Sequence, residues 1–224
     1  MIPVLGIPIL NGQDRLKDML DSIDVPVGEI IIVDNGDVVT ESEHTVIKPK
    51  CNLGVGASWN LVIKSRPKAE WWAMSNHDLV YSPGDLQRLI DSMGEVVMLG
   101  AGFSIFGISR NAVKQLGYFD ENFHPAYFED NDYDYRCRLS GVEIKSIPSG
   151  SKHAVSSTLV DDPQYRRQNL PTFMSNRDYY HKKWGGRPYA ETFKTPFDLG
   201  GDPNEWTVDI DRLSQQGWVR ASDR

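Results

Sequence analysis

Two stretches near the amino terminus decide the fold class: IPVLGIPIL at residues 2–10 and EIIIVDNG at residues 29–36. The first is a short apolar run with prolines near its ends, and the second is a β-branched run that ends in a turn sequence. Each therefore predicts a buried strand. Between them, the apolar residues of segment 16–23 recur at i, i+3, i+4 and i+7, which predicts a helix with one apolar face. This strand–helix–strand order predicts an α/β fold with a mostly parallel sheet covered by helices.

The same alternation continues to about residue 150. Further strands are predicted at residues 45–47, 71–74, 102–109 and 143–147. Further helices are predicted at residues 57–64, 83–93, 110–116 and 128–141. From about residue 155 the chain is polar, aromatic and rich in proline. We therefore divide the chain into a catalytic core, residues 1–153, and a carboxyl-terminal extension, residues 154–224, that is expected to pack on the core as an acceptor-site or oligomer element.

The extension contains one predicted helix, residues 172–184. Its aromatic stripe of Phe173, Tyr180 and Trp184 is expected to face the core. Four basic side chains of the extension are expected on a solvated face: Arg166, Arg167, Lys182 and Lys183.

The overall charge and composition exclude several classes of protein. Lys and Arg total 24 and Asp and Glu total 31, so the net charge of −7 argues against a nucleic-acid-binding protein. The sequence has no apolar run near the roughly 20 residues that span a bilayer, and its first residues do not resemble a signal peptide. The two cysteines, Cys51 and Cys137, lie far apart, which favours a reducing compartment. We expect a cytoplasmic protein.

Polar side chains follow the predicted strands at the points where the strands end. They are Asn11, Asp34, Asn35, Asn76 and Asp78. Ligands of open α/β sheets bind beyond the carboxyl ends of the strands, so these residues are the first candidates for a site. A carboxylate at a strand end accepts hydrogen bonds from a ribose or base, or binds Mg²⁺ or Mn²⁺ beside a diphosphate. On their own, the same sequences are more often ordinary turns than ligand sites.

Two further segments carry candidate chemistry. The loop NLGVGA at residues 52–57 contains two glycines, which allow the backbone to approach a ligand closely. The run EDNDYD at residues 129–134 places four acids in six residues at the start of a predicted helix. Acids stabilise a helix N-terminus, but four exceed that need, and one of them can serve as a general base.

Several motifs then follow one another in a fixed order. They are IPILN (7–11), IVDN (32–35), N-x-G-x-G-x-x-x-N (52–60), NHD (76–78) before SPG (82–84), R-x₆-GYFDENF (110–123), YFEDND (127–132), R-x₄-G (136–141) and His153. This order resembles the family-2 glycosyltransferases of GT-A fold, in particular the rhamnosyltransferase-like branch. The block at residues 127–132 is the most specific of these matches.

The resemblance implies a GT-A, Rossmann-like three-layer sandwich with a mostly parallel central sheet. It implies nucleotide-sugar binding by Pro8, Asn11, Asp34, Asn35, Asn52, Gly54, Asn60 and Asn76. Asp78 and His153 would hold Mn²⁺ or Mg²⁺, and Asp130 would be the general base, with Glu129 orienting it or contacting the acceptor. The implied reaction is an inverting transfer of a hexose or deoxyhexose from a nucleotide sugar. UDP is the expected nucleotide, with dTDP and GDP as alternatives.

The run YYHKKWGG at residues 179–186 resembles extensions of bacteriophage-encoded glycosyltransferases, which would place the protein in the host cytoplasm. The expected acceptor is a protein or a glycan, because the acidic charge disfavours modified DNA. Asn76 stands where many family members have Asp, which implies a weaker dependence on metal. Two alternatives stay open: a nucleotidyltransferase, and a nucleotide- or glycan-binding module that has lost catalysis.

Overall fold

A computed structural model describes residues 1–100, 102–153 and 163–201, without the side chains of His153 and Gln164. The strands are β1 (Ile2–Ile9), β2 (Val27–Asp34), β3 (Thr45–Ile47), β4 (Trp71–Ser75), β5 (Leu79–Val80), β6 (Val96–Leu99), β7 (Ile105–Ser109), β8 (Ile144–Ile147) and β9 (Lys152–His153). The helices are α1 (Gln13–Asp21), α2 (Val55–Ser65), α3 (Asp85–Ser92), α4 (Arg110–Leu116), α5 (Glu129–Ser140), α7 (Pro163–Trp184) and the 3₁₀ helix η1 (Pro196–Asp198).

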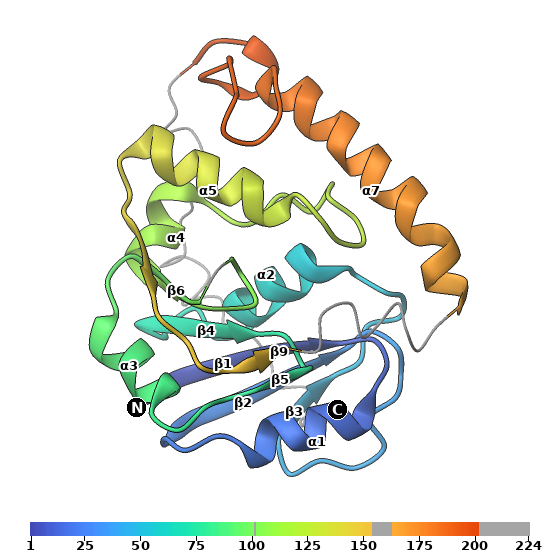
Figure 1. Cartoon of the computed structure of the whole chain (residues 1–224), viewed down its shortest axis with the longest axis vertical. Coiled ribbons are helices and arrows are strands. Elements are labelled where there is room, and N and C mark those ends of the chain that lie inside the picture. The colour runs from blue at the N-terminus through green and yellow to red at the C-terminus, as the bar shows by residue number, and fades with distance from the viewer. Residues whose placement is uncertain (101, 154–162, 202–224) are drawn as a thin grey trace.

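The central sheet has seven strands in the order β3-β2-β1-β4-β7-β6-β8 (Figure 1). All neighbours pair in parallel except β7, which is antiparallel to both β4 and β6. The prediction of an α/β fold with a mostly parallel sheet is therefore confirmed. The sequence pattern missed β6, which is only four residues long, and it began β7 three residues too early.

Helices cover both faces of this sheet, which makes three layers. Successive residues of β2 point to opposite faces, so Ile31 packs into one apolar core and Ile32 into the other. The first core takes buried side chains from α2, α4 and α5, including Trp59 and Tyr133. The second takes side chains from α1 and α3, including Met19. The strands β1 and β2 are apolar on both faces, as is usual in a parallel sheet, so both faces have to be covered by helices.

The helix α7 forms a further element beside α5 (Figure 1). It begins at Pro163, well before the predicted start, and continues through Pro171 to Trp184, the predicted end. Tyr180 and Trp184 are fully buried in an aromatic cluster with Phe123 and Tyr135, whereas Phe173 is 38% exposed. None of the helices in the described part of the chain has the length and apolar character needed to cross a bilayer.

Candidate active site

A cleft of about 830 Å³ opens at the carboxyl ends of β1, β2 and β4. Its volume lies in the range of about 300–1,000 Å³ that is usual for ligand sites. Of the residues that the sequence nominated for nucleotide-sugar or metal binding, the cleft brings together Pro8, Asn35, Asn52, Gly54, Asn76 and Asp78. Among the residues whose side chains are described, Asn11, Asp34 and Asn60 are not part of its lining, and neither are the two candidate catalytic acids, Glu129 and Asp130.

Two amides that line the cleft hold its loops together. Asn35 donates from Nδ2 to Ser58 Oγ at 2.9 Å, and its Oδ1 accepts from the backbone N–H of Leu53 at 2.9 Å. Asn52 accepts from the N–H of Gly54 at 2.9 Å and donates to the hydroxyl of Tyr165 at 2.8 Å. These bonds join the end of β2 to the loop before α2, and that loop to α7, so the wall of the cleft is built from three distant parts of the sequence.

Gly54 lets two loops of the cleft approach each other. Its φ of +78° is readily available only to glycine, and a Cβ on this residue would lie 2.6 Å from the carbonyl oxygen of Pro125. The next residue, Val55, donates its N–H to that same oxygen at 2.8 Å. The glycine that the sequence nominated for close approach to a ligand therefore also permits close approach between loops.

Asp34 and Asn60 form hydrogen bonds within the protein and are not among the described residues that line the cleft, so their binding of a nucleoside stays a prediction. The Asp34 carboxylate is buried and accepts from the backbone N–H groups of Gly36, Val38 and Val39, at 3.3, 3.0 and 2.8 Å. It therefore shapes the loop after β2. Asn60 is also buried; it exchanges hydrogen bonds with the backbone of Phe119 at 2.9 Å in both directions. Both side chains thus hold backbone segments in place.

Asp78 lies at the cleft just before β5, and strand pairing brings the backbone of His153 near it in space. The strands β5 and β9 pair in antiparallel fashion with Leu79 opposite His153. The loop before β9 is fixed by buried Asp85, which accepts from the N–H groups of Gly150 and Ser151 at 3.0 and 2.9 Å. The side chain of His153 lies outside the described residues. Among the side chains that are described, no group of three or more His, Cys, Asp or Glu could hold a metal ion.

The two candidate catalytic acids begin α5, shortly after the cleft-lining residue Tyr127. Glu129 is 6% exposed, and its Oε2 is buried without a hydrogen bond among the described residues. Burial, followed by the nearby charge of Asp130, raises the pKa of Glu129 well above its ordinary value. Burial also raises the pKa of Asp130, although the N–H of Asn131 bonds the carboxylate and opposes this shift. Both acids therefore bind protons more tightly than ordinary carboxylates.

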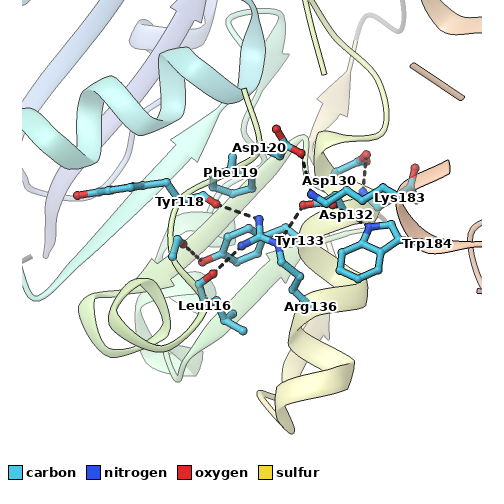
Figure 2. Close-up of polar contacts among 12 residues, drawn as sticks. Leu116, Tyr118, Phe119, Asp120, Asp130, Asp132, Tyr133, Arg136, Lys183 and Trp184 are labelled. Carbon is cyan, nitrogen blue, oxygen red and sulfur yellow. Dashed lines mark hydrogen bonds and ion pairs between the residues drawn. The ribbon is translucent and has the colours of Figure 1, made fainter. Parts of the chain in front are cut away.

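A buried ion-pair cluster joins α7 to α5 and to the loop before it (Figure 2). Lys183 Nζ lies 2.7 Å from Asp120 Oδ2 and 2.6 Å from Asp132 Oδ1. Asp132 is also bonded by Arg136 at 2.9 Å and by the indole N–H of Trp184 at 2.8 Å. Lys183 is 7% exposed, so the expectation that it lies on a solvated face is wrong. Its ion pairs with two acidic partners that are distant in sequence offset the cost of removing the ammonium from water.

The sequence also missed the contribution of α7 to the cleft. The residues of this helix that line it are Tyr165, Arg167, Gln168, Asn169, Pro171 and Thr172. They precede or lie at the start of the predicted helix, because the segment before Thr172 has no apolar periodicity. Their only local signal is a run of polar residues, which is also typical of a loop.

Comparison with known proteins supports this architecture. No protein-family model matches the chain. A galactofuranosyl glycosyltransferase of Leishmania donovani is 28% identical over 131 residues, which cover 48% of this chain and 30% of that protein. The chain thus matches less than a third of the length of that relative.

Two solved structures resemble the fold. The mannosyltransferase PcManGT from Pyrobaculum calidifontis, solved with GDP-Man and Mn²⁺, gives a TM-score of 0.54 at 12% identity and covers 96% of this chain and 78% of its own. TarS residues 1–349 from S. aureus, solved with UDP, gives a TM-score of 0.51 at 16% identity. The match covers 66% of this chain and 58% of the TarS chain. The chain has the GT-A fold. At sequence identities of 12% and 16%, this structural similarity is evidence for the fold only and not for the activity.

Proposed function

We propose that this protein is a glycosyltransferase that uses a nucleoside-diphosphate sugar. The observation that carries the proposal is the cleft at the ends of β1, β2 and β4, which holds Asn35, Asn76 and Asp78 within a GT-A fold. The likeness to a glycosyltransferase sequence supports the same activity. Since ligands of α/β sheets bind at this edge, the donor would lie across these strand ends.

The residues at the cleft fit a divalent cation together with a diphosphate. Mg²⁺ and Mn²⁺ prefer oxygen ligands, and Mg²⁺ sites commonly use only one or two carboxylates, with substrate phosphates and waters completing the shell. Asp78 supplies one such carboxylate, and the pairing of β5 with β9 brings the His153 backbone to the neighbouring strand. When bound, the cation would stabilise the charge of the departing diphosphate. Asp78, with His153, would hold it.

The chain's own residues would bind the donor and take the proton. An acceptor hydroxyl oxygen forms a bond to the anomeric carbon from the face opposite the diphosphate, the carbon–oxygen bond to the diphosphate breaks, and its electron pair stays on the leaving diphosphate. The proton of the hydroxyl passes to Asp130, whose raised pKa improves it as a base. Glu129, the buried neighbour, would orient Asp130. The configuration at the anomeric carbon would be inverted.

For the donor we propose a UDP-sugar first, with GDP- and dTDP-sugars as the alternatives. One structural neighbour was solved with UDP and the other with GDP-Man, so the fold accommodates both kinds of nucleotide. Asp34 and Asn60 would support the loops around the nucleotide rather than contact it, because their polar atoms are already bonded within the protein.

The test is a screen of UDP-, GDP- and dTDP-sugars with Mn²⁺, read by release of nucleoside diphosphate. Slow donor hydrolysis that depends on the chain supports the proposal. Turnover to pyrophosphate would instead indicate a nucleotidyltransferase, and thermal stabilisation without any turnover would indicate a binding module. Asp130→Asn should abolish transfer while donor binding, measured by calorimetry, stays within about twofold. Retained transfer would remove Asp130 as the base.

A further inference from the structure

The cleft has a second wall that donor binding does not account for. It is formed by residues of α7, namely Tyr165, Arg167, Gln168, Asn169, Pro171 and Thr172, which line the same cleft as the strand ends. Because α7 belongs to the part of the chain farthest in sequence from β1 and β2, this wall is a separate structural contribution to the site.

The chemistry of this wall is polar and nearly uncharged. Gln168 and Asn169 carry amides, which both donate and accept hydrogen bonds, and Thr172 carries a hydroxyl. Among the α7 residues that the structure describes at the cleft, none is acidic and only Arg167 is a cation. A nucleic-acid backbone would require several cations, so this wall does not suit DNA. Amide and hydroxyl groups beside apolar surface suit a ligand that has many hydroxyl groups.

The wall is held in place by hydrogen bonds to the opposite loops. Asn169 Oδ1 accepts from the hydroxyl of Tyr127, which itself lines the cleft. The Nδ2 donor of the same amide makes no hydrogen bond with the residues that the structure describes, so it can donate to a ligand. One helical turn beyond the cleft, buried Asn176 donates to the carbonyl oxygen of Ala126 at 2.8 Å. The polar groups of α7 are therefore fixed relative to the loop that leads into the catalytic acids.

At its far end, α7 is anchored to the core by Lys183 and Trp184 (Figure 2) and by the buried ring of Tyr180. A helix anchored at one end and bonded across the cleft at the other loses little further conformational entropy when a ligand binds. Preorganisation of this kind favours binding of a flexible, hydroxyl-rich ligand.

We infer that the α7 wall is the acceptor subsite and that the acceptor is a carbohydrate, bound through its hydroxyl groups by Gln168, Asn169 and Thr172. This inference rests on the proposed glycosyltransferase function. It chooses a glycan over a protein or DNA acceptor, and it assigns the extension a direct role in binding. In the transfer, the hydroxyl that is held by this wall provides the attacking oxygen, and its proton leaves to Asp130 as above.

The experiment uses the full chain with the donor found in the screen. Acceptors are the p-nitrophenyl glycosides of galactose, mannose, glucose and N-acetylglucosamine, alongside a Ser/Thr-rich peptide and a short DNA duplex. We expect at least one glycoside to accelerate release of nucleoside diphosphate above donor hydrolysis, with a disaccharide product seen by mass spectrometry. Acceleration by the peptide or DNA alone would overturn the inference while leaving the glycosyltransferase function intact. If the protein does not hydrolyse any donor, both the proposed glycosyltransferase function and this inference are wrong.

Variants of α7 separate recognition from folding. Gln168→Ala changes an exposed side chain, and Asn169→Asp keeps the oxygen that accepts from Tyr127 but removes the donor. Each should raise the KM for the glycoside about fivefold, the value of one neutral hydrogen bond, while the KM for the donor changes much less. Ser175→Ala, exposed on the same helix and away from the cleft lining, is the matched control. Glycoside KM values equal to that of the control would overturn the assignment of this wall.

Discussion

Removing the Lys183 ammonium should destabilise the protein strongly. The Lys183 side chain is 8% exposed, and its partners Asp120 and Asp132 are 13% and 0% exposed. Lys183→Met keeps the apolar stem but leaves two buried carboxylates with less compensation. Breaking a buried ion pair costs about 3–5 kcal/mol. Because Asp132 keeps Arg136 and Asp120 keeps a bond from Asn122, we expect the lower end, about 3 kcal/mol.

For a chain of this size, that loss corresponds to a fall in Tm of roughly 6–12 °C, at about 2–4 °C per kcal/mol. The assay is urea and thermal unfolding followed by far-UV circular dichroism. The control is Lys182→Met, because the adjacent lysine is exposed and its loss should stay within about 0.5 kcal/mol. The double variant Asp120→Asn/Lys183→Met should recover part of the loss, since it removes one of the uncompensated charges.

The pH dependence gives an independent check. Burial on its own would raise the pKa of Asp120, but the Lys183 ammonium and the bonds from Asn122 outweigh burial and lower it. A lowered folded-state pKa contributes stability above the ordinary carboxyl pKa, and that stability is lost as pH falls through the folded value. The difference in unfolding free energy between wild type and Lys183→Met should therefore become smaller as the pH is lowered into the acid range. Two results would refute the proposed role of the ion-pair cluster. One is a loss of unfolding free energy below about 1 kcal/mol at neutral pH, and the other is a difference between the two proteins that does not change with pH.

Three further changes test other parts of the site. Glu129→Gln should leave Tm unchanged near about pH 4 and raise it increasingly toward about pH 8, because a raised folded-state pKa makes the charged form of Glu129 destabilising as pH rises. A Tm difference between variant and wild type that stays constant with pH would contradict this. Gly54→Ala should cost about 1–3 kcal/mol in urea unfolding, since its φ is +78° and the new Cβ would meet a carbonyl oxygen, whereas Gly94→Ala, which has open space, should not. Asp78→Ala should abolish the increase in donor affinity that Mn²⁺ gives in calorimetry; an unchanged Mn²⁺ effect would show that the metal assignment fails.

The sheet and its edge could be predicted because their signals are local. The apolar runs of β1 and β2 and the polar residues after them are adjacent in sequence, and parallel topology alone brings Asn35 and Asn76 to one edge. The exact use of each polar residue could not be predicted in this way. Asp34 stands at the expected strand end, yet backbone N–H groups within five residues of it take up its carboxylate. Whether a strand-end acid faces a ligand or its own loop depends on the path of that loop.

Long-range partners explain the other failures. Lys183 and Asp120 are 63 residues apart, and Asn52 and Tyr165 are 113 residues apart. A lysine between a charged residue and an aromatic one has no local signal for burial, and a tyrosine in a polar segment has none for a place in a cleft. Such roles follow only from the packing of α7 against the core, and the sequence pattern places the start of that helix too late.

The cluster also explains why four acids begin α5 when only some of them are suited to chemistry. Asp132 is neutralised by Lys183 and Arg136, and Asp134 is bonded by Arg138 at 3.0 Å, so both serve the structure. Among the described residues, Glu129 and Asp130 have no ion-pair partner, and the pKa of each is raised. Cations that hold α5 in place are thus kept away from its first two acids. Asp130, which we propose as the general base, is thus a carboxylate of increased basicity at the end of the helix next to the cleft.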